Sequence, residues 1–282
     1  MSAHKNDMTT WAEIKCQRGC EAHRSRLVSV RLGGPTGYSD LPPIPQRFAR
    51  DFDLTVWDPS AHPVDDGPYC PARDCVSETI TAMGVWEPVE TIVVLDILSR
   101  PDVAGSFLDV GAQVGWFSVL AQSCGREVDA VECDADNARL FALNLSAADS
   151  HERTRIYRQR VGVDALPELP QRIALAKIDV EGAEPAVVDW LMPAVEAGRV
   201  GAVLMEVSPV FHDGYMAACL RLRDAGMRAY ALPEKGYPPR PMATEPGELL
   251  GQLTLLEPKE NLAAFVASTR QANVLFARGD VR

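Results

Sequence analysis

Ser106-Phe-Leu-Asp-Val-Gly-Ala-Gln-Val-Gly115 is the stretch of sequence that decides the fold. An apolar run over 106–110 predicts a short buried strand, and the apolar pattern of 116–124 predicts a helix directly after the loop. Gly111 and Gly115 allow the loop between them to turn sharply and to approach a ligand closely. The first turn of the following helix presents free N–H groups at the same place. A strand, a glycine-containing turn and a helix together predict the start of a nucleoside-binding βαβ unit.

Strands and helices alternate on both sides of this stretch. Strands are predicted at 128–131, 155–161, 173–180, 200–207, 228–232 and 273–277, and helices at 87–98, 136–147, 185–197 and 215–225. This alternation predicts an α/β fold, a Rossmann-like doubly wound, mostly parallel sheet of about seven strands with helices on both faces. Ligands of such sheets bind at the carboxyl ends of the strands, so the residues that end the strands are the candidates for function.

Charge divides the chain into two parts. Residues 1–50 carry 8 basic and 4 acidic side chains, whereas residues 51–282 carry 20 basic and 35 acidic ones, for a net charge of −11. We therefore predict a basic, partly irregular N-terminal extension over 1–50 and an acidic main domain over 51–282. Phosphate neutralisation needs a basic surface, so the acidic domain is not expected to bind nucleic acid.

The apolar stretches are too short for a membrane protein. The longest, 92–98 and 114–121, fall far short of the roughly 20 residues that a membrane helix needs, and the first ten residues contain no apolar signal region. Seven scattered cysteines indicate a reducing compartment rather than a disulfide framework. We expect a cytoplasmic protein without a membrane partner, and the sequence leaves its oligomeric state open.

Two acidic residues beside the glycine loop indicate the cofactor. Asp109 precedes Gly111 by two positions, and Glu132 ends the next predicted strand, where a carboxylate can accept hydrogen bonds from both ribose hydroxyls. The spacing Gly-x-x-x-Gly differs from the Gly-x-Gly-x-x-Gly of NAD-binding loops. An acidic group suits the ammonium of S-adenosylmethionine (SAM) better than a pyrophosphate. The alternative is that Asp109 only tethers the turn and Glu132 is an exposed charge.

A second motif, Lys177-Ile-Asp-Val-Glu-Gly-Ala-Glu184, follows the fourth strand of the predicted sheet. It places three carboxylates within six residues beside the expected cofactor end. Asp179 lies where the strand meets the cleft and is the strongest candidate for function. Glu184 also suits the first turn of a helix, where the helix dipole favours a negative charge, and Glu181 also suits a solvated loop.

Together the two motifs resemble the FkbM family of SAM-dependent methyltransferases, over about residues 51–278. Residues 84–88, Gly-Val-Trp-Glu-Pro, and the strand that ends at Glu206 are also similar to that family. The resemblance implies a SAM site formed by Asp109, Gly111, Ala112, Gln113, Gly115, Glu132 and Cys133, with Glu132 at the ribose and Cys133 near the adenine. It also implies that Asp179 and Glu181 face the methyl-transfer cleft and that Glu206 borders the acceptor. Gln113 stands where the family has Asn, and the connection from Val161 to Ile173 is shorter than in the family.

The function expected from this is O-methylation of a hydroxyl on a glycan or a small-molecule natural product, by direct in-line transfer from SAM. A general base assists when the hydroxyl has a high pKa, and the candidates are Asp179, Glu181, Glu206 and His212. Grouped carboxylates can also bind Mg²⁺, although we expect no metal site. The spacing of Cys16, Cys20 and His23 does not complete a zinc site. Two other functions stay open, a catalytically degenerate SAM-fold binding or scaffold protein and an NAD-linked oxidoreductase.

Overall fold

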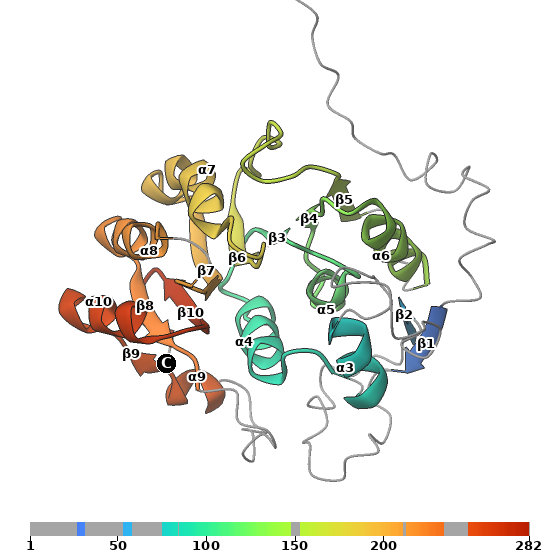
Figure 1. Ribbon diagram of the computed structural model, residues 1–282, viewed down its shortest axis with the longest axis horizontal. Helices are drawn as coiled ribbons and strands as arrows, with labels where there is room; N and C mark the ends of the chain where they lie inside the picture. The colour runs from blue at the N-terminus through green and yellow to red at the C-terminus, as the bar shows by residue number, and fades with distance from the viewer. Residues whose placement is uncertain are drawn as a thin grey trace, which may run out of the picture.

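An eight-stranded sheet forms the centre of the molecule (Figure 1). The computed structural model describes residues 27–31, 53–57, 75–83, 85–147, 153–210, 213–233 and 248–281. The strand order is β5-β4-β3-β6-β7-β10-β8-β9. The strands are β3 (Ser106–Val110), β4 (Val128–Val131), β5 (Thr154–Tyr157), β6 (Ile173–Ile178), β7 (Val200–Val207), β8 (Arg228–Ala231), β9 (Thr254–Leu255) and β10 (Ala272–Ala277).

Five neighbouring strands, β5 to β7 in the sheet order, run parallel. β10 lies antiparallel between β7 and β8, and the two-residue β9 pairs antiparallel with the outer edge of β8. The predicted fold class, a Rossmann-like and mostly parallel α/β sheet, is confirmed. The sheet has eight strands rather than about seven because β9 adds a short one. β5 ends at Tyr157, earlier than the predicted 161.

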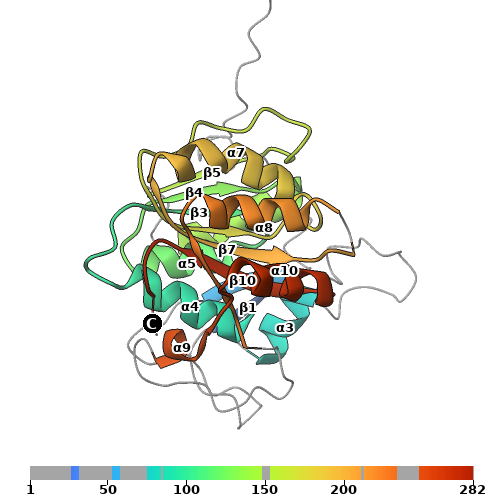
Figure 2. The same ribbon diagram turned by 90° about the vertical axis from the view of Figure 1, so that its left-hand side faces the viewer.

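Helices cover both faces of the sheet (Figure 2). One face packs against α4 (Pro88–Leu98), α5 (Trp116–Ser123) and α6 (Ala135–Ala147), and the other against α7 (Glu184–Glu196), α8 (Tyr215–Asp224) and α10 (Lys259–Ser268). Two short helices, α3 (Cys75–Met83) and α9 (Glu248–Gln252), extend the first layer. In α4 every residue from Glu90 to Leu98 is buried, as expected for a helix that is apolar on all sides.

A separate two-stranded sheet packs beside α6. β1 (Leu27–Arg31) pairs antiparallel with β2 (Asp53–Trp57). Leu54 and Val56 are buried in the same core cluster as α5 and α6. β1 thus comes from the predicted extension and β2 from the predicted domain, and the boundary at residue 50 stays a prediction.

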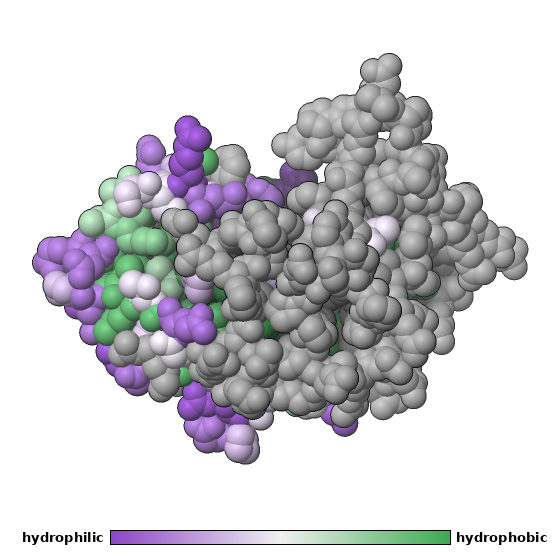
Figure 3. Space-filling model, turned by 90° about the horizontal axis from the view of Figure 1, so that it is seen from below, coloured by the Kyte–Doolittle hydropathy of each residue, from purple (hydrophilic) through white to green (hydrophobic). Residues whose placement is uncertain are grey.

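The described surface offers neither a membrane span nor a broad apolar face. No helix among the described residues is long and apolar enough to cross a bilayer. Figure 3 shows hydrophobic residues gathered on the side of α8 and α10, interspersed with hydrophilic ones. The large hydrophobic side chains exposed in the described ranges, Leu143, Val163 and Val210, lie on separate segments. We therefore place the candidate site by its polar residues.

Candidate functional site

The glycine loop lies at the carboxyl end of β3 and is held by the protein's own backbone. Gly111 and Gly115 have φ angles of 89° and 86°, which residues with a side chain rarely adopt. A Cβ on Gly111 would lie 1.7 Å from the carbonyl oxygen of Asp179, and one on Gly115 would lie 2.0 Å from the ring of Phe141. The predicted sharp turn is present. The close approach that the glycines permit is to β6 and α6.

Asp109 is buried at the end of β3, with 1% of its surface exposed. Its carboxylate accepts a hydrogen bond from the hydroxyl of Ser118 at 2.6 Å and another from the backbone N–H of Ser118, so it tethers the first turn of α5. Burial raises the pKa of Asp109 to about 6, although the Ser118 hydroxyl and the Lys177 ammonium oppose the shift. The tethering role that we weighed as an alternative is therefore present in the structure.

Glu132, at the end of β4, bridges two loops. Its carboxylate accepts the backbone N–H of Gln113 and that of Asp134, each at 2.7 Å. Glu132 is buried, so it is not the exposed charge of the alternative interpretation, and burial raises its pKa. Ala112 is buried in the loop, whereas Cys133 is exposed next to Glu132. The structure thus brings the predicted cofactor residues together around the ends of β3 and β4.

Carboxylates gather on the other side of β3, at the ends of β6 and β7. Oxygens of Glu87, Asp179 and Glu206 lie within 4.8 Å of one another. The Lys177 ammonium donates a hydrogen bond to Asp179 Oδ2 at 2.8 Å and lies 3.5 Å from Glu87 Oε2. This one ammonium therefore pairs with two of the three carboxylates, and the cluster as a whole stays negatively charged.

Glu206 is the carboxylate of this cluster that neutral donors hold. The Ser208 hydroxyl donates to its Oε1, and the Gln271 side-chain amide donates to its Oε2, both at 2.9 Å. Burial, and next the negative charge of Asp179, raise its pKa. A carboxylate with a raised pKa is a stronger base near neutral pH than an ordinary one.

Glu181 and Glu184 lie close together but differ in role. Glu181 is exposed in a left-handed conformation with a φ of 52°, and burial followed by the charge of Asp179 raises its pKa. Glu184 is fully buried, and its carboxylate accepts the backbone N–H groups of Val180 and Gly182 and the hydroxyl of Tyr215. Glu184 therefore fixes the loop that carries Asp179 and Glu181.

Sequence analysis missed Lys177 and Glu87 as members of the site. Lys177 is a cation within the apolar strand sequence IALAKI, a signal that could have identified it, because a buried charge needs a partner. Glu87 joins the cluster through its left-handed backbone (φ 41°), which no sequence pattern revealed. His212 lies outside the described residues, as do Cys16, Cys20 and His23.

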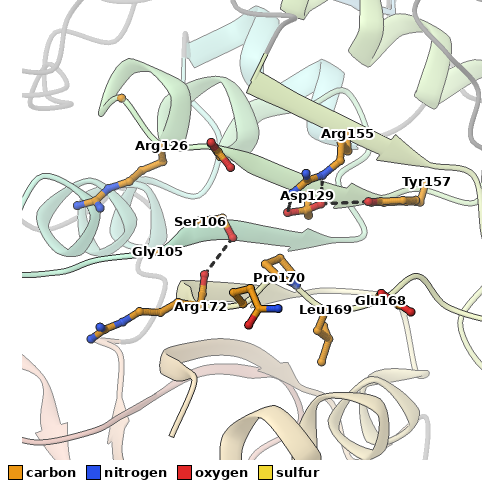
Figure 4. Close-up of a pocket in the computed structure, with 13 residues that line it drawn as sticks. Gly105, Ser106, Arg126, Asp129, Arg155, Tyr157, Glu168, Leu169, Pro170 and Arg172 are labelled. Atoms are coloured by element: carbon orange, nitrogen blue, oxygen red, sulfur yellow. Dashed lines mark hydrogen bonds and ion pairs between the residues drawn. The ribbon is translucent and has the colours of Figure 1, made fainter.

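A pocket of about 670 Å³ lies at the amino ends of the strands, opposite the glycine loop (Figure 4). It is lined by residues that precede β3, β4 and β6, together with side chains of β4 and β5. Arg155 makes two hydrogen bonds, at 2.6 and 2.8 Å, to the buried Asp129, which also accepts one from the Tyr157 hydroxyl. Because its lining lies at the amino ends of the strands, this pocket is separate from the candidate site at their carboxyl ends.

The connection between β5 and β6 explains where this pocket comes from. Residues 158–172 form turns but no helix, although doubly wound folds usually place a helix at such a crossover. The Trp190 indole N–H donates to the Pro167 carbonyl at 3.2 Å, and Arg199 donates to the Pro170 carbonyl at 2.9 Å. These bonds anchor the short connection beside α7. The pocket lies between this connection and the side chains of β4 and β5.

Comparison with known proteins finds similar solved structures but no family. No family model matches the chain, and no curated protein matches it. One similar structure is precorrin-6y C5,15-methyltransferase from Geobacter metallireducens, with 15% identity, a TM-score of 0.41 and coverage of 69% of this chain and 90% of that one.

Two others were crystallised with S-adenosylhomocysteine (SAH). An O-methyltransferase from Bacillus cereus has 13% identity, a TM-score of 0.44 and coverage of 69% and 83%. Geranyl diphosphate C-methyltransferase from Streptomyces coelicolor, whose structure also holds Mg²⁺ and geranyl diphosphate, has 14% identity, a TM-score of 0.42 and coverage of 77% and 86%. The structural neighbours are thus methyltransferases of differing substrates, and at this level of similarity they carry no argument about substrate or reaction here.

Proposed function

We propose that this protein is a SAM-dependent O-methyltransferase of the FkbM type, acting on a hydroxyl of a glycan or a small-molecule natural product. The observation that carries the proposal is the arrangement around β3. Glu132 lies on the β4 side of the glycine loop, and the cluster of Glu87, Asp179 and Glu206 lies on the β6 side. A nucleoside end and a reaction end thus flank one loop at the switch point of the sheet.

Two features of this chain disfavour an NAD-linked oxidoreductase. The dinucleotide-binding fold orders its strands 3-2-1-4-5-6, whereas here the antiparallel β10 separates β7 from β8. The loop N–H groups that a pyrophosphate would need are also in use. Those of Gly111 and Ala112 donate to Val131, and that of Gln113 donates to Glu132.

The residues at the loop fit a cofactor that is cationic and carries no phosphate. Glu132 keeps acceptor capacity for ribose hydroxyls, since each of its oxygens accepts one backbone N–H and has a further lone pair. Asp109, Gly111, Ala112, Gln113, Gly115 and Cys133 complete the set that would hold SAM. When bound, SAM would supply a methyl group to the acceptor oxygen, and the neutral thioether SAH would be the leaving group.

The cluster on the β6 side can bind and deprotonate an acceptor. Carboxylates accept hydrogen bonds from hydroxyls, so Asp179 and Glu181 can orient the acceptor at the loop. Glu206, with its raised pKa, is the preferred proton acceptor among them. Because Glu87, Asp179 and Glu206 lie so close together, they would repel an acceptor that carries a carboxylate or phosphate. We therefore propose an uncharged acceptor with several hydroxyls.

A catalytically degenerate scaffold with the same fold is the second candidate. The observation that favours it is the short connection 158–172, which forms no helix beside the cofactor end of β5. Such a protein would lack turnover with every acceptor, even if it bound the cofactor.

Calorimetry with SAH and NAD, followed by a SAM-consumption screen, tests the proposal. We expect SAH to bind and NAD not to bind, and at least one acceptor in a panel of methyl glycosides, phenols and macrolide alcohols to be methylated. Asp179→Asn should lower turnover about 100-fold or more and leave the Kd for SAH within threefold. Asp189→Asn, on the exposed face of α7, serves as the control and should change neither. Absence of SAH binding would refute the proposal, and SAH binding without any turnover would favour the scaffold.

A further inference from the structure

Lys177 is buried among carboxylates beside the proposed reaction end. Its side chain has 4% of its surface exposed, and its ammonium lies 2.8 Å from Asp179 Oδ2 and 3.5 Å from Glu87 Oε2. The ring of Phe117, on α5, lies under the ammonium at 4.6 Å from its centroid. Three elements, β6, α5 and the residue that precedes α4, therefore enclose this one cation.

The charges around Lys177 keep it protonated. Burial lowers the pKa of the ammonium, but the carboxylates of Asp179 and Glu87 raise it further, so that it ends above its ordinary value. The carboxylate of Asp109 adds to this effect.

Stability alone is a weak reason for such an arrangement. Buried ion pairs often contribute no more to folding than apolar residues of similar volume, because both charges must lose their hydration. The neighbours of Lys177 in β6 are apolar, so an apolar side chain would suit the strand. What the ammonium adds is a fixed position for Asp179, whose side chain remains 18% exposed toward solvent while its Oδ2 is held.

We propose that Lys177 is a positioning residue, which holds the carboxylate of Asp179 in place so that its exposed side binds the acceptor. This inference rests on the proposed function, since it concerns the same cleft. Lys177 acts through Asp179 and, at 4% exposure, does not itself touch the acceptor. Removing Lys177 should then matter only as long as Asp179 is present.

A double-mutant cycle tests this inference. The variants are Lys177→Met, Lys177→Arg, Asp179→Asn and the double variant Lys177→Met/Asp179→Asn, with Lys259→Met as the control. Lys259 is a lysine of α10 that pairs with Asp224 near the surface. Calorimetry would follow SAH binding, and turnover with the acceptor identified in the panel would give kcat.

We expect Lys177→Met to lower kcat about 100-fold and, like Asp179→Asn, to leave the Kd for SAH within threefold. Lys177→Arg should recover part of the loss. The double variant should turn over like Asp179→Asn alone. If Lys177→Met does not fold, Lys177→Arg and the double variant are compared with Asp179→Asn instead. The double variant has one fewer unpaired buried charge than Lys177→Met.

Losses of Lys177→Met and Asp179→Asn that simply add would overturn the positioning role while leaving the methyltransferase proposal intact. Failure of the wild-type protein to bind SAH would instead overturn the proposed function, and the positioning role with it.

Discussion

At the residue scale, buried Asp109 lowers the free energy of unfolding by an amount that depends on pH. The unfolded chain releases the proton of an aspartate near pH 4, whereas in the folded protein burial holds the pKa of Asp109 at about 6. Between these values the folded state binds a proton that the unfolded state has released. Stability from this group is therefore highest below pH 4 and falls as the pH rises to 6.

The expected loss over this interval is about 3 kcal/mol, since one pKa unit corresponds to about 1.4 kcal/mol. Asp109→Asn should remove this part of the pH dependence, which urea unfolding at pH 4.5 and pH 7 would measure. Ser118→Ala should instead raise the pKa of Asp109 further, because the Ser118 hydroxyl lowers it in the wild-type protein. The loss of stability should then continue above pH 6. Identical pH dependence in wild-type protein and Asp109→Asn would contradict the assignment.

Single residues also show how far sequence reasoning reaches. The motifs located Asp109, Glu132, Asp179 and Glu206 at strand ends because strand ends follow from an apolar pattern. The motifs did not reveal Glu87, since only the folded chain brings the start of α4 to β6. Nor did they show that the glycines accommodate Asp179 and Phe141, which are far away in sequence.

At the element scale, the loop between β6 and α7 depends on one side chain. The buried carboxylate of Glu184 accepts two backbone N–H groups of this loop, from Val180 and Gly182, and the hydroxyl of Tyr215 on α8. Sequence analysis assigned Glu184 to the first turn of a helix on the basis of the helix dipole. Its position there is as predicted, and its contacts make it the anchor of the loop that carries Asp179 and Glu181.

Glu184→Ala should therefore lower the free energy of unfolding by about 3 kcal/mol, because it leaves several buried donors without an acceptor. Turnover should fall as well, since the loop is released. Glu196→Ala, at the exposed end of the same helix, should stay within about 0.5 kcal/mol of wild type. Equal urea midpoints for the two variants would show that Glu184 does not anchor the loop.

Elements with a regular pattern were predicted and elements stabilised by distant contacts were not. The predicted bounds of β3, β4 and β7 agree with the structure residue by residue. α3 escaped prediction because its sequence CVSETITAM contains several β-branched residues, which are weak helix formers. Its helix is stabilised by packing, with Ile80 buried in the core that it shares with β2.

At the scale of the whole molecule, the chain joins its N-terminal strands to the main sheet through Asn144. The Asn144 side chain accepts the N–H of Thr55 at 2.7 Å and donates to the carbonyls of Thr55 and Val114, at 2.9 and 2.7 Å. One amide on α6 thus connects β2 with the glycine loop. With Leu54 and Val56 also in the core, the two-stranded sheet and the domain should unfold as one unit.

Asn144→Ala tests this cooperativity. It should lower the free energy of unfolding by about 3 kcal/mol, because the groups that Asn144 pairs become buried and unsatisfied. Unfolding should still follow one transition, with coincident curves from tryptophan fluorescence and far-ultraviolet circular dichroism. Arg139→Ala, which removes a surface ion pair on the same helix, should cost less than about 1 kcal/mol. Two separate transitions would instead mean that the two-stranded sheet unfolds independently of the main sheet once the contacts of Asn144 are lost.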